Sequence, residues 1–180
     1  MKKTVITYGL ISGAISAAAM VVTGLQADKI GFDNGAVIGY ISMVVAFSFV
    51  YFGILSYRNN VSGGRVSYSR ALSIGLLIVV ISCICYAITW AVVYHTLFPD
   101  FIEKYTTYTI AKMKAKGAPA SEIDKQLMQM QQYKEVYKNP VMMLLFTFIE
   151  PLPVGVPIAF VSAFLVQIRR KTAIADQVFV

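Results

Sequence analysis

The stretch from Ala71 to Phe98, ALSIGLLIVVISCICYAITWAVVYHTLF, contains no lysine, arginine, aspartate or glutamate. A helix needs about 20 apolar residues to cross the roughly 30 Å hydrocarbon core of a membrane, so this stretch is long enough to span it. Three further apolar runs approach or exceed that length, at 4–25, 36–57 and 141–168. They are too long for barrel strands, and backbone amides that face lipid must be hydrogen-bonded within their own segment. The sequence therefore predicts an all-α fold with four transmembrane helices.

The composition of the whole chain also indicates a membrane protein. The 180 residues are 57% hydrophobic and 14% charged, which is more apolar surface than one soluble domain of this length can bury. We therefore expect a single integral-membrane domain over residues 1–180, with the lipid bilayer as its first partner. The start, MKKTVITYGLISGAISAAAM, resembles a cleavable signal, but its apolar run continues to Leu25, so we expect an uncleaved span.

The net charge of +7 predicts a topology rather than nucleic-acid binding. With four spans, the N-terminus, the second connection and the C-terminal tail share one side of the membrane. That side carries all five arginines, and its only acid is Asp176. Its basic residues are Lys2, Lys3, Arg58, Arg65, Arg70, Arg169, Arg170 and Lys171. Basic residues in short loops favour the cytoplasm, so both termini are expected there, and no nucleic acid is expected as a partner.

Small residues recur at helical spacing in the first span. Gly9, Gly13 and Ala17 are four residues apart, and this spacing lets another helix approach closely. We expect these three residues to form a helix-packing face. Gly35 and Gly39 repeat the spacing at the start of the second span, and the sequence leaves open whether they make a contact.

Two short polar connections join the first three spans. In the first, at 26–36, the Asp33-Asn34-Gly35 sequence predicts a tight turn between antiparallel neighbours. The second contains SGGR at 62–65, which lacks the spacing and the Lys-Ser/Thr pair of a nucleotide phosphate loop. We interpret it as a basic turn, with Ser67 or Ser69 as a helix cap.

The polar segment 100–138 predicts an external helical hairpin between spans three and four. One apolar stripe is formed by Phe101, Tyr105 and Tyr108, and a second by Ile123, Leu127, Met130 and Tyr137. Gly117 and Pro119 predict the end of the first helix, and Ser121 an N-cap for the second. The stripes either zip together in an upright hairpin, which we favour, or lie on the membrane surface. The Asn139-Pro140 sequence predicts the joint with the fourth span.

The fourth run, which includes FIEPLPVGVPIAF, places Glu150 among three prolines, Pro151, Pro153 and Pro157. Residues before proline avoid helical angles, so Glu150 and Leu152 are expected to be extended and the helix broken. In one interpretation 141–149 is an interfacial or partly buried apolar helix, Glu150 marks the water boundary, and the span itself begins at Pro151. In a second, Glu150 is a structural acid near the membrane midplane, neutral and hydrogen-bonded. In a third, it binds ions or protons at a broken span.

A polar intramembrane site around Glu150 requires partners at the same depth on other spans. Counting residues along the predicted spans places Ser16, Tyr86 and Thr89 at that level. No catalytic, cofactor or metal site is expected, because the chain has one histidine, His95, and no arrangement of nucleophile, base and acid. Cys83 and Cys85 face different sides of a helix and are expected to be reduced packing residues.

The order of these features resembles a known family. A basic start, a glycine-rich first span, GGRVSYSRALSIG at 63–75, a long polar segment with lysines and methionines, and a last span ending SAFLVQIRRK are similar to an uncharacterised membrane-protein family of Bacteroidetes, domain of unknown function 4199. The resemblance covers about residues 1–171 and implies four spans in the bacterial inner membrane. It implies no activity and no site residue.

Two functions of different classes are consistent with the sequence. The first is a non-enzymatic scaffold or accessory subunit whose small-residue face packs helices and whose hairpin meets a membrane protein, a periplasmic protein or a second copy of the chain. The alternative is a small ion- or proton-coupled transporter centred on Glu150. Catalysis is not expected, because the sequence offers no paired intramembrane carboxylates.

Overall fold

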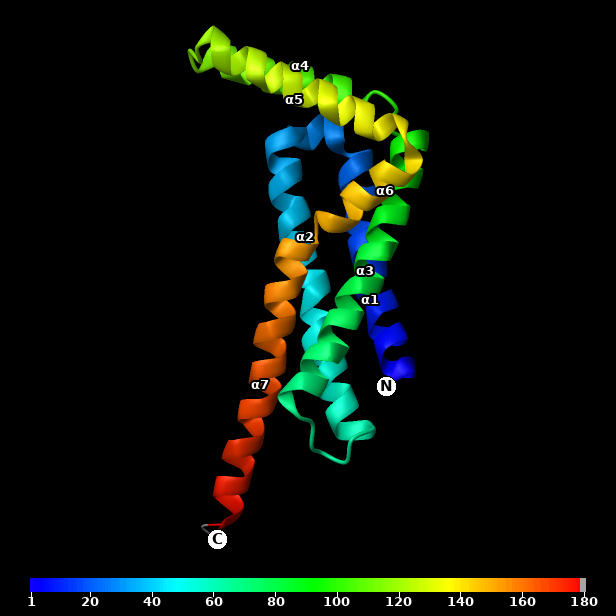
Figure 1. Cartoon of the computed structure of the whole chain (residues 1–180), viewed down its shortest axis with the longest axis vertical. Coiled ribbons are helices and arrows are strands. Elements are labelled where there is room, and N and C mark those ends of the chain that lie inside the picture. Colours follow the sequence, from blue (N-terminus) through cyan, green and yellow to red (C-terminus); the bar gives the residue numbers. More distant parts are fainter. Residues whose placement is uncertain (179–180) are drawn as a thin grey trace.

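The computed structural model (Figure 1) describes the backbone of residues 1–178 and the side chains of residues 1–27 and 29–167. Every regular element within that range is a helix, as predicted. The elements are α1 (Lys2–Leu25), α2 (Ala27–Asn60), α3 (Tyr68–Thr96), α4 (Phe101–Ala115), α5 (Ala120–Lys138), α6 (Pro140–Ile149) and α7 (Leu152–Val178). Four segments are long and apolar enough to cross a membrane: Lys2–Leu25, Lys29–Asn60, Tyr68–Thr96 and Pro140–Gln167. The predicted all-α four-helix bundle is confirmed, and a helical hairpin, α4–α5, lies between its third and fourth spans.

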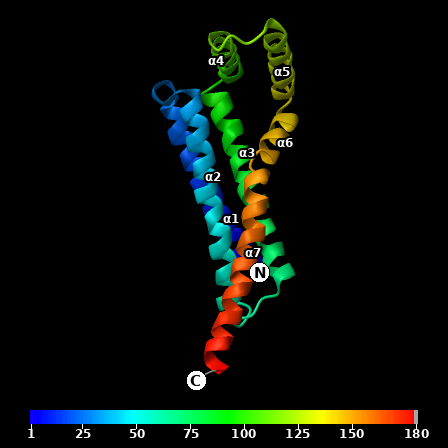
Figure 2. The ribbon, with the colours of Figure 1, turned by 90° about the vertical axis from the view of Figure 1, so that its left-hand side faces the viewer.

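The four spans pack around a central pair of helices. α1 and α7 each pack against both α2 and α3. α1 and α3 run in one direction, and α2 and α7 run in the other (Figure 1). The hairpin lies at one end of the bundle, whereas the start of α1 and the end of α7 point towards the other end (Figure 2). The two termini are therefore on the same side of the bundle, as an even number of spans requires.

The first connection differs from its prediction. α2 begins at Ala27 and kinks at Gly31, where φ is 71° and ψ is 163°. The predicted turn residues 33–35 are helical. A left-handed φ is readily available only to glycine, so Gly31 sets the bend and the Asp-Asn-Gly sequence continues the helix.

The tightly packed core lies in the half of the bundle nearer the termini. Phe47 and Ile54 of α2 and Ile74 and Ile78 of α3 are at most 1% exposed. α7 adds Ala159, Ala163 and Val166 to the same core. The first residue of α2 in this core is Met43, so the part of α2 nearer the hairpin contributes nothing to it.

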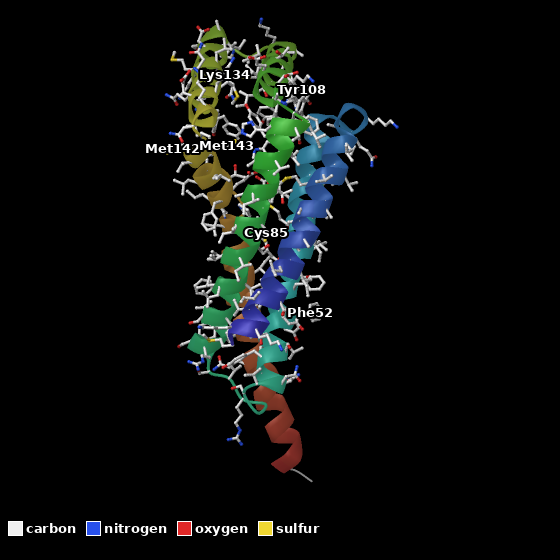
Figure 3. All side chains as sticks on the ribbon, turned by 90° about the vertical axis from the view of Figure 1, so that its right-hand side faces the viewer. Phe52, Cys85, Tyr108, Lys134, Met142 and Met143 are labelled. Carbon is white, nitrogen blue, oxygen red and sulfur yellow. The ribbon has the colours of Figure 1, made fainter. Side chains whose placement is uncertain are left out.

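α1 approaches α3 closely along the small-residue face. A Cβ atom on Gly9 would lie 2.7 Å from Cβ of Ile81, and one on Gly13 would lie 2.6 Å from Cβ of Cys85. Cys85 lies on the part of α3 that faces α1 (Figure 3). No larger side chain fits at either glycine without moving α3, because contacts this short are repulsive.

A buried hydrogen bond crosses the same seam. The hydroxyl oxygens of Ser12 and Ser82 are 3.0 Å apart, and both residues are at most 1% exposed. Short side chains let two helices share such a bond within a membrane. Gly39 is different, because no atom lies within 4 Å of a Cβ built there.

The hairpin lies across the end of the bundle, so the upright orientation is wrong (Figure 1). The aromatic stripe of α4 packs on Phe32, next to the Gly31 kink, instead of zipping against α5. The ring centroid of Phe32 is 6.0 Å from that of Phe101, 5.5 Å from that of Tyr105 and 5.1 Å from that of Tyr108. Burial of this stripe against the bundle tilts the hairpin sideways.

Polar groups reinforce this attachment. The Tyr108 hydroxyl donates to Oδ2 of Asp33 at 2.7 Å, and Nζ of Lys112 donates to Oδ1 at 2.6 Å. Both Lys112 and Asp33 are exposed, with side-chain exposures of 40% and 61%. Exposed ion pairs contribute at most about 1 kcal/mol, so the aromatic contacts hold the hairpin and the ion pair fixes its register.

The two hairpin helices meet through a different face of α4 from the one predicted. The buried residues of the two helices are Ile102 in α4 and Met130 in α5, at 8% and 7% exposure. Nζ of Lys134 donates to Oε1 of Glu103 at 2.6 Å and lowers the pKa of that carboxyl. The apolar face of α4 towards α5 thus contains Ile102, the residue after Phe101, which belongs to the stripe that packs on Phe32.

The turn of the hairpin is only partly as predicted. Gly117, with φ at 71°, follows the end of α4 as expected. The N-cap of α5 is Pro119, and Ser121 lies inside the helix, so the predicted cap is wrong. With φ at −66° and ψ at 151°, Pro119 holds the extended backbone that precedes a helix, so no serine cap is needed.

We predict that Phe32→Ala releases the hairpin from the bundle. The substitution removes three ring contacts, each worth roughly 0.5–1.5 kcal/mol, so opening should become about 2 kcal/mol easier. Amide hydrogen exchange in residues 101–115 should accelerate about thirtyfold. Phe52→Ala is the control, because Phe52 is an exposed residue of α2 (Figure 3). Equal protection of α4 in the wild type and Phe32→Ala would contradict this attachment.

We also predict that Gly13→Leu and Gly39→Leu differ in stability. Leucine at Gly13 collides with Cys85, and overpacking of this kind costs about 1–3 kcal/mol. Leucine at Gly39 meets open space and should change stability by less than about 0.5 kcal/mol. Thermal unfolding of the detergent-purified variants, followed by tryptophan fluorescence, measures the difference. Equal unfolding temperatures would show that α1 and α3 are not in close contact.

Candidate functional site

The fourth span consists of two helices, α6 and α7, rather than one continuous helix. α6 begins at the predicted Asn139-Pro140 joint. There the Asn139 side chain accepts hydrogen bonds from the backbone N–H groups of Val141, at 3.0 Å, and Met142, at 3.3 Å. Met143 is buried, whereas Met142 is exposed (Figure 3). α6 packs along α3.

Two prolines cause the break between α6 and α7. Pro151 and Pro153 have no N–H group, so the carbonyl oxygens of Thr147 and Ile149 lack the donor that a continuous helix supplies four residues later. Freed carbonyl oxygens within a span are polar groups that can bind a cation or a hydrogen-bond donor. The break therefore adds acceptors next to the carboxyl group of Glu150.

The predicted extended backbone at Glu150 and Leu152 is wrong. Glu150 has helical angles, φ at −54° and ψ at −46°, and Leu152 begins α7. Pro151 precedes α7, and its carbonyl oxygen accepts from the N–H of Gly155 at 2.9 Å. Pro153 falls in the first turn of α7, where a helix requires no N–H donor. The chain thus interrupts its hydrogen-bond ladder at the prolines, while Glu150 itself keeps helical angles.

The Glu150 carboxyl group interacts with the hydroxyl group of Tyr86 on α3. The Glu150 side chain is exposed at the protein surface. Tyr86, however, lies about 15 Å along α3 from its end at Thr96, which is roughly half the thickness of a hydrocarbon core. A hydroxyl partner suits an acid at this depth, because ionised side chains there are costly.

Aromatic residues connect this pair to the hairpin. Tyr86, Trp90 and Tyr94 recur every fourth residue on one face of α3. Nε1 of Trp90 donates to the hydroxyl of Tyr137 at 3.2 Å, and the rings of Tyr94 and Tyr137 are 5.1 Å apart. Tyr137 lies near Thr147 of α6, whose hydroxyl donates to the carbonyl oxygen of Met143 at 2.9 Å, and burial raises the pKa of Tyr137.

The sequence prediction missed two members of this group. The sequence places Tyr137 only on the apolar stripe of the hairpin, and it gives no reason to select Thr147. The spacing of four in α3 is the signal that identifies the aromatic column. The group therefore draws on α3, α5 and α6.

Two other predicted members lie elsewhere. Ser16 is buried in α1, and α1 packs on α2 and α3. The Thr89 hydroxyl donates to the carbonyl oxygen of Cys85 at 2.8 Å. Of the predicted polar set, the structure thus pairs Glu150 with Tyr86. Gly9 and Gly13 lie at the contact with α3, and Ala17 is half-buried in the next turn of α1.

The chemistry of the site is that of an isolated carboxyl group. The ion pairs among the described side chains all involve lysines outside this site, and none includes Glu150. The described residues contain no group of three metal-ligating side chains. His95 is exposed, and its ring lies 5.4 Å from that of Tyr94. Glu150, Tyr86 and the freed carbonyl oxygens can hold a proton or a single cation.

Comparison with known proteins gives a family without an established activity. No curated protein and no solved structure matches the chain. The family described as "Protein of unknown function (DUF4199)" matches residues 7–167, a range that includes the hairpin, the break in the fourth span and nearly all of the apolar helices. The chain therefore belongs to the DUF4199 family.

Proposed function

We propose that the protein is a non-enzymatic scaffold or accessory subunit of the bacterial inner membrane, with both termini in the cytoplasm. Charge supports the topology: Lys2, Lys3, Arg58, Arg65 and Arg70 all belong to the end of the bundle that is opposite the hairpin. The side chains of Arg169, Arg170, Lys171 and Asp176 lie outside those described. The remaining cluster of lysines is on the hairpin, where acids accompany it. The positive-inside rule then assigns the hairpin to the periplasm.

The observation that carries the proposal is the fixed hairpin. Phe32 and Asp33 hold α4 in one pose, and the Lys134–Glu103 pair joins α4 to α5. In this pose α5 leaves apolar side chains exposed, with Met128 61% exposed and Leu127 37% exposed. Apolar side chains on a rigid polar helix are suitable anchors for a partner.

The partner is a membrane protein, a periplasmic protein or a second copy of the chain. No cofactor and no nucleic acid is part of the proposal. The close seam between α1 and α3 supports it further, because it makes the bundle a rigid support for the hairpin. Isolated helices as short as α4 and α5 are marginal in water, so the bundle also supplies their stability.

We predict that the double variant Leu127→Ser, Met128→Ser loses the partner. The wild type, extracted from native membranes into polymer nanodiscs, should carry a second polypeptide of constant stoichiometry, as measured by native mass spectrometry. The amount of second polypeptide bound to the variant should fall at least about fivefold. Loss of an interface anchor costs more than about 1 kcal/mol of binding free energy. Gln131→Ser, on the exposed part of α5, is the matched control. A wild-type chain that is always single in such discs would contradict the scaffold proposal.

A second candidate function is transport of an ion or a proton through Glu150. The interaction with Tyr86 and the freed carbonyl oxygens of the broken span favour it. In proteoliposomes Glu150→Gln should then reduce proton or cation flux at least about tenfold, because the amide can neither release a proton nor balance a cation. Glu122→Gln, on the exposed start of α5, controls for loss of a carboxylate. Equal flux in the wild type and Glu150→Gln would exclude this candidate.

A further inference from the structure

A pocket at the opposite end of the molecule from the hairpin has the groups that bind an anion. Most of its lining residues belong to the connection between α2 and α3. This connection is at the end of the bundle towards which the termini point (Figure 1). The volume of the pocket is about 400 Å³, and it is lined by Tyr57, Ser62, Arg65, Val66, Ser67 and Arg70. Gly63 and Gly64, with φ at 61° and 81°, allow the tight fold of this connection.

Tyr57 is a nearly buried polar side chain that reaches this pocket. It is 6% exposed and is part of the pocket lining. Its hydroxyl has no hydrogen-bond partner among the described residues. The Tyr57 hydroxyl is not among the fully buried unpartnered atoms of the described residues, so it keeps access to solvent and can donate a hydrogen bond to a ligand in the pocket.

The start of α3 adds further free donors. Ser67 is the N-cap residue, and its side chain makes no capping hydrogen bond. The first backbone N–H groups of a helix have no acceptor within the helix, and they carry partial positive charge. The first turn of α3 contains no acidic residue that could neutralise them. Ser67 lines the pocket, and these N–H groups follow it directly in the chain.

Two arginines supply positive charge at the mouth of the pocket. Arg65 and Arg70 are exposed, and the ion pairs among the described side chains do not include them. Arg58 differs, because one of its guanidinium nitrogens donates to the carbonyl oxygen of Val166 at 3.2 Å. The Ser62 hydroxyl donates to the Arg65 carbonyl oxygen and shapes the loop. No acid of the described chain lines the pocket.

We propose that this pocket binds the phosphate group of an anionic phospholipid headgroup. Phosphate oxygens accept several hydrogen bonds at once, and arginine binds them through two parallel N–H groups. The pocket lies where the apolar helices α2 and α3 end, which is the level of the headgroups of a leaflet. A soluble nucleotide is a weaker match, because SGGR lacks the phosphate-loop pattern.

The test counts lipids bound to the full-length purified protein by native mass spectrometry, with phosphatidylglycerol and phosphatidylcholine as probes. The wild type should prefer phosphatidylglycerol about tenfold or more. Arg65→Gln and Arg70→Gln should each reduce phosphatidylglycerol binding about tenfold, the scale of one charge-assisted hydrogen bond. Tyr57→Phe keeps the ring and removes only the hydroxyl, so it should reduce binding about threefold to tenfold while stability is retained.

Lys3→Gln, an exposed charge at the same end of the bundle, is the matched control and should leave binding unchanged. If each arginine variant loses no more binding than Lys3→Gln, or if phosphatidylcholine binds equally well, the proposal is overturned. A fully folded Tyr57→Phe with unchanged binding counts against the pocket as well. Inorganic phosphate then separates two sources: arginine-dependent displacement of the lipid supports a site for free phosphate esters, and no displacement supports the lipid headgroup.

Discussion

Hydrocarbon cannot satisfy a backbone amide or carbonyl, and the rest of the structure depends on this constraint. Each apolar run must cross as a helix, which leaves side-chain packing to decide how the helices meet. The fourth span is the exception, because Pro151 and Pro153 remove two donors within it. The break adjoins Glu150, whose carboxyl group interacts with the hydroxyl group of Tyr86 on α3.

The two halves of the bundle are held together by different kinds of contact. In the half nearer the termini, α2, α3 and α7 bury a continuous apolar core that includes Phe47 and Ile78. In the other half aromatic and polar contacts replace that core, and Phe32 and Tyr137 connect the spans to the hairpin. The firmly packed half supports the half that carries the candidate site. Such support would hold the hairpin of a scaffold, or the carboxyl group of a cation-binding protein, in a fixed position.

The sequence predicted those features that depend on local chemistry. Apolar length located the spans, Gly117 the end of α4, and Asn139 the start of α6. Features that depend on distant contacts were not predictable in this way. The hairpin lies sideways because its aromatic stripe packs on Phe32. Counting residues predicts the depth of Ser16, Tyr86 and Thr89 along their helices, but it does not predict which side of the helix each residue faces. Tyr86 alone of these three faces Glu150.

The central claim is that the break of the fourth span lies within the hydrocarbon core. A nitroxide attached to Ile149→Cys, in a chain carrying Cys83→Ala and Cys85→Ala, tests it directly, because Ile149 is 59% exposed and adjoins Glu150. In lipid bilayers, collision with dissolved oxygen should exceed collision with a water-soluble nickel complex, and the reverse should hold for a nitroxide at Met128 on the hairpin. Equal access of the nickel complex to positions 149 and 128 would place the break in water and contradict the account.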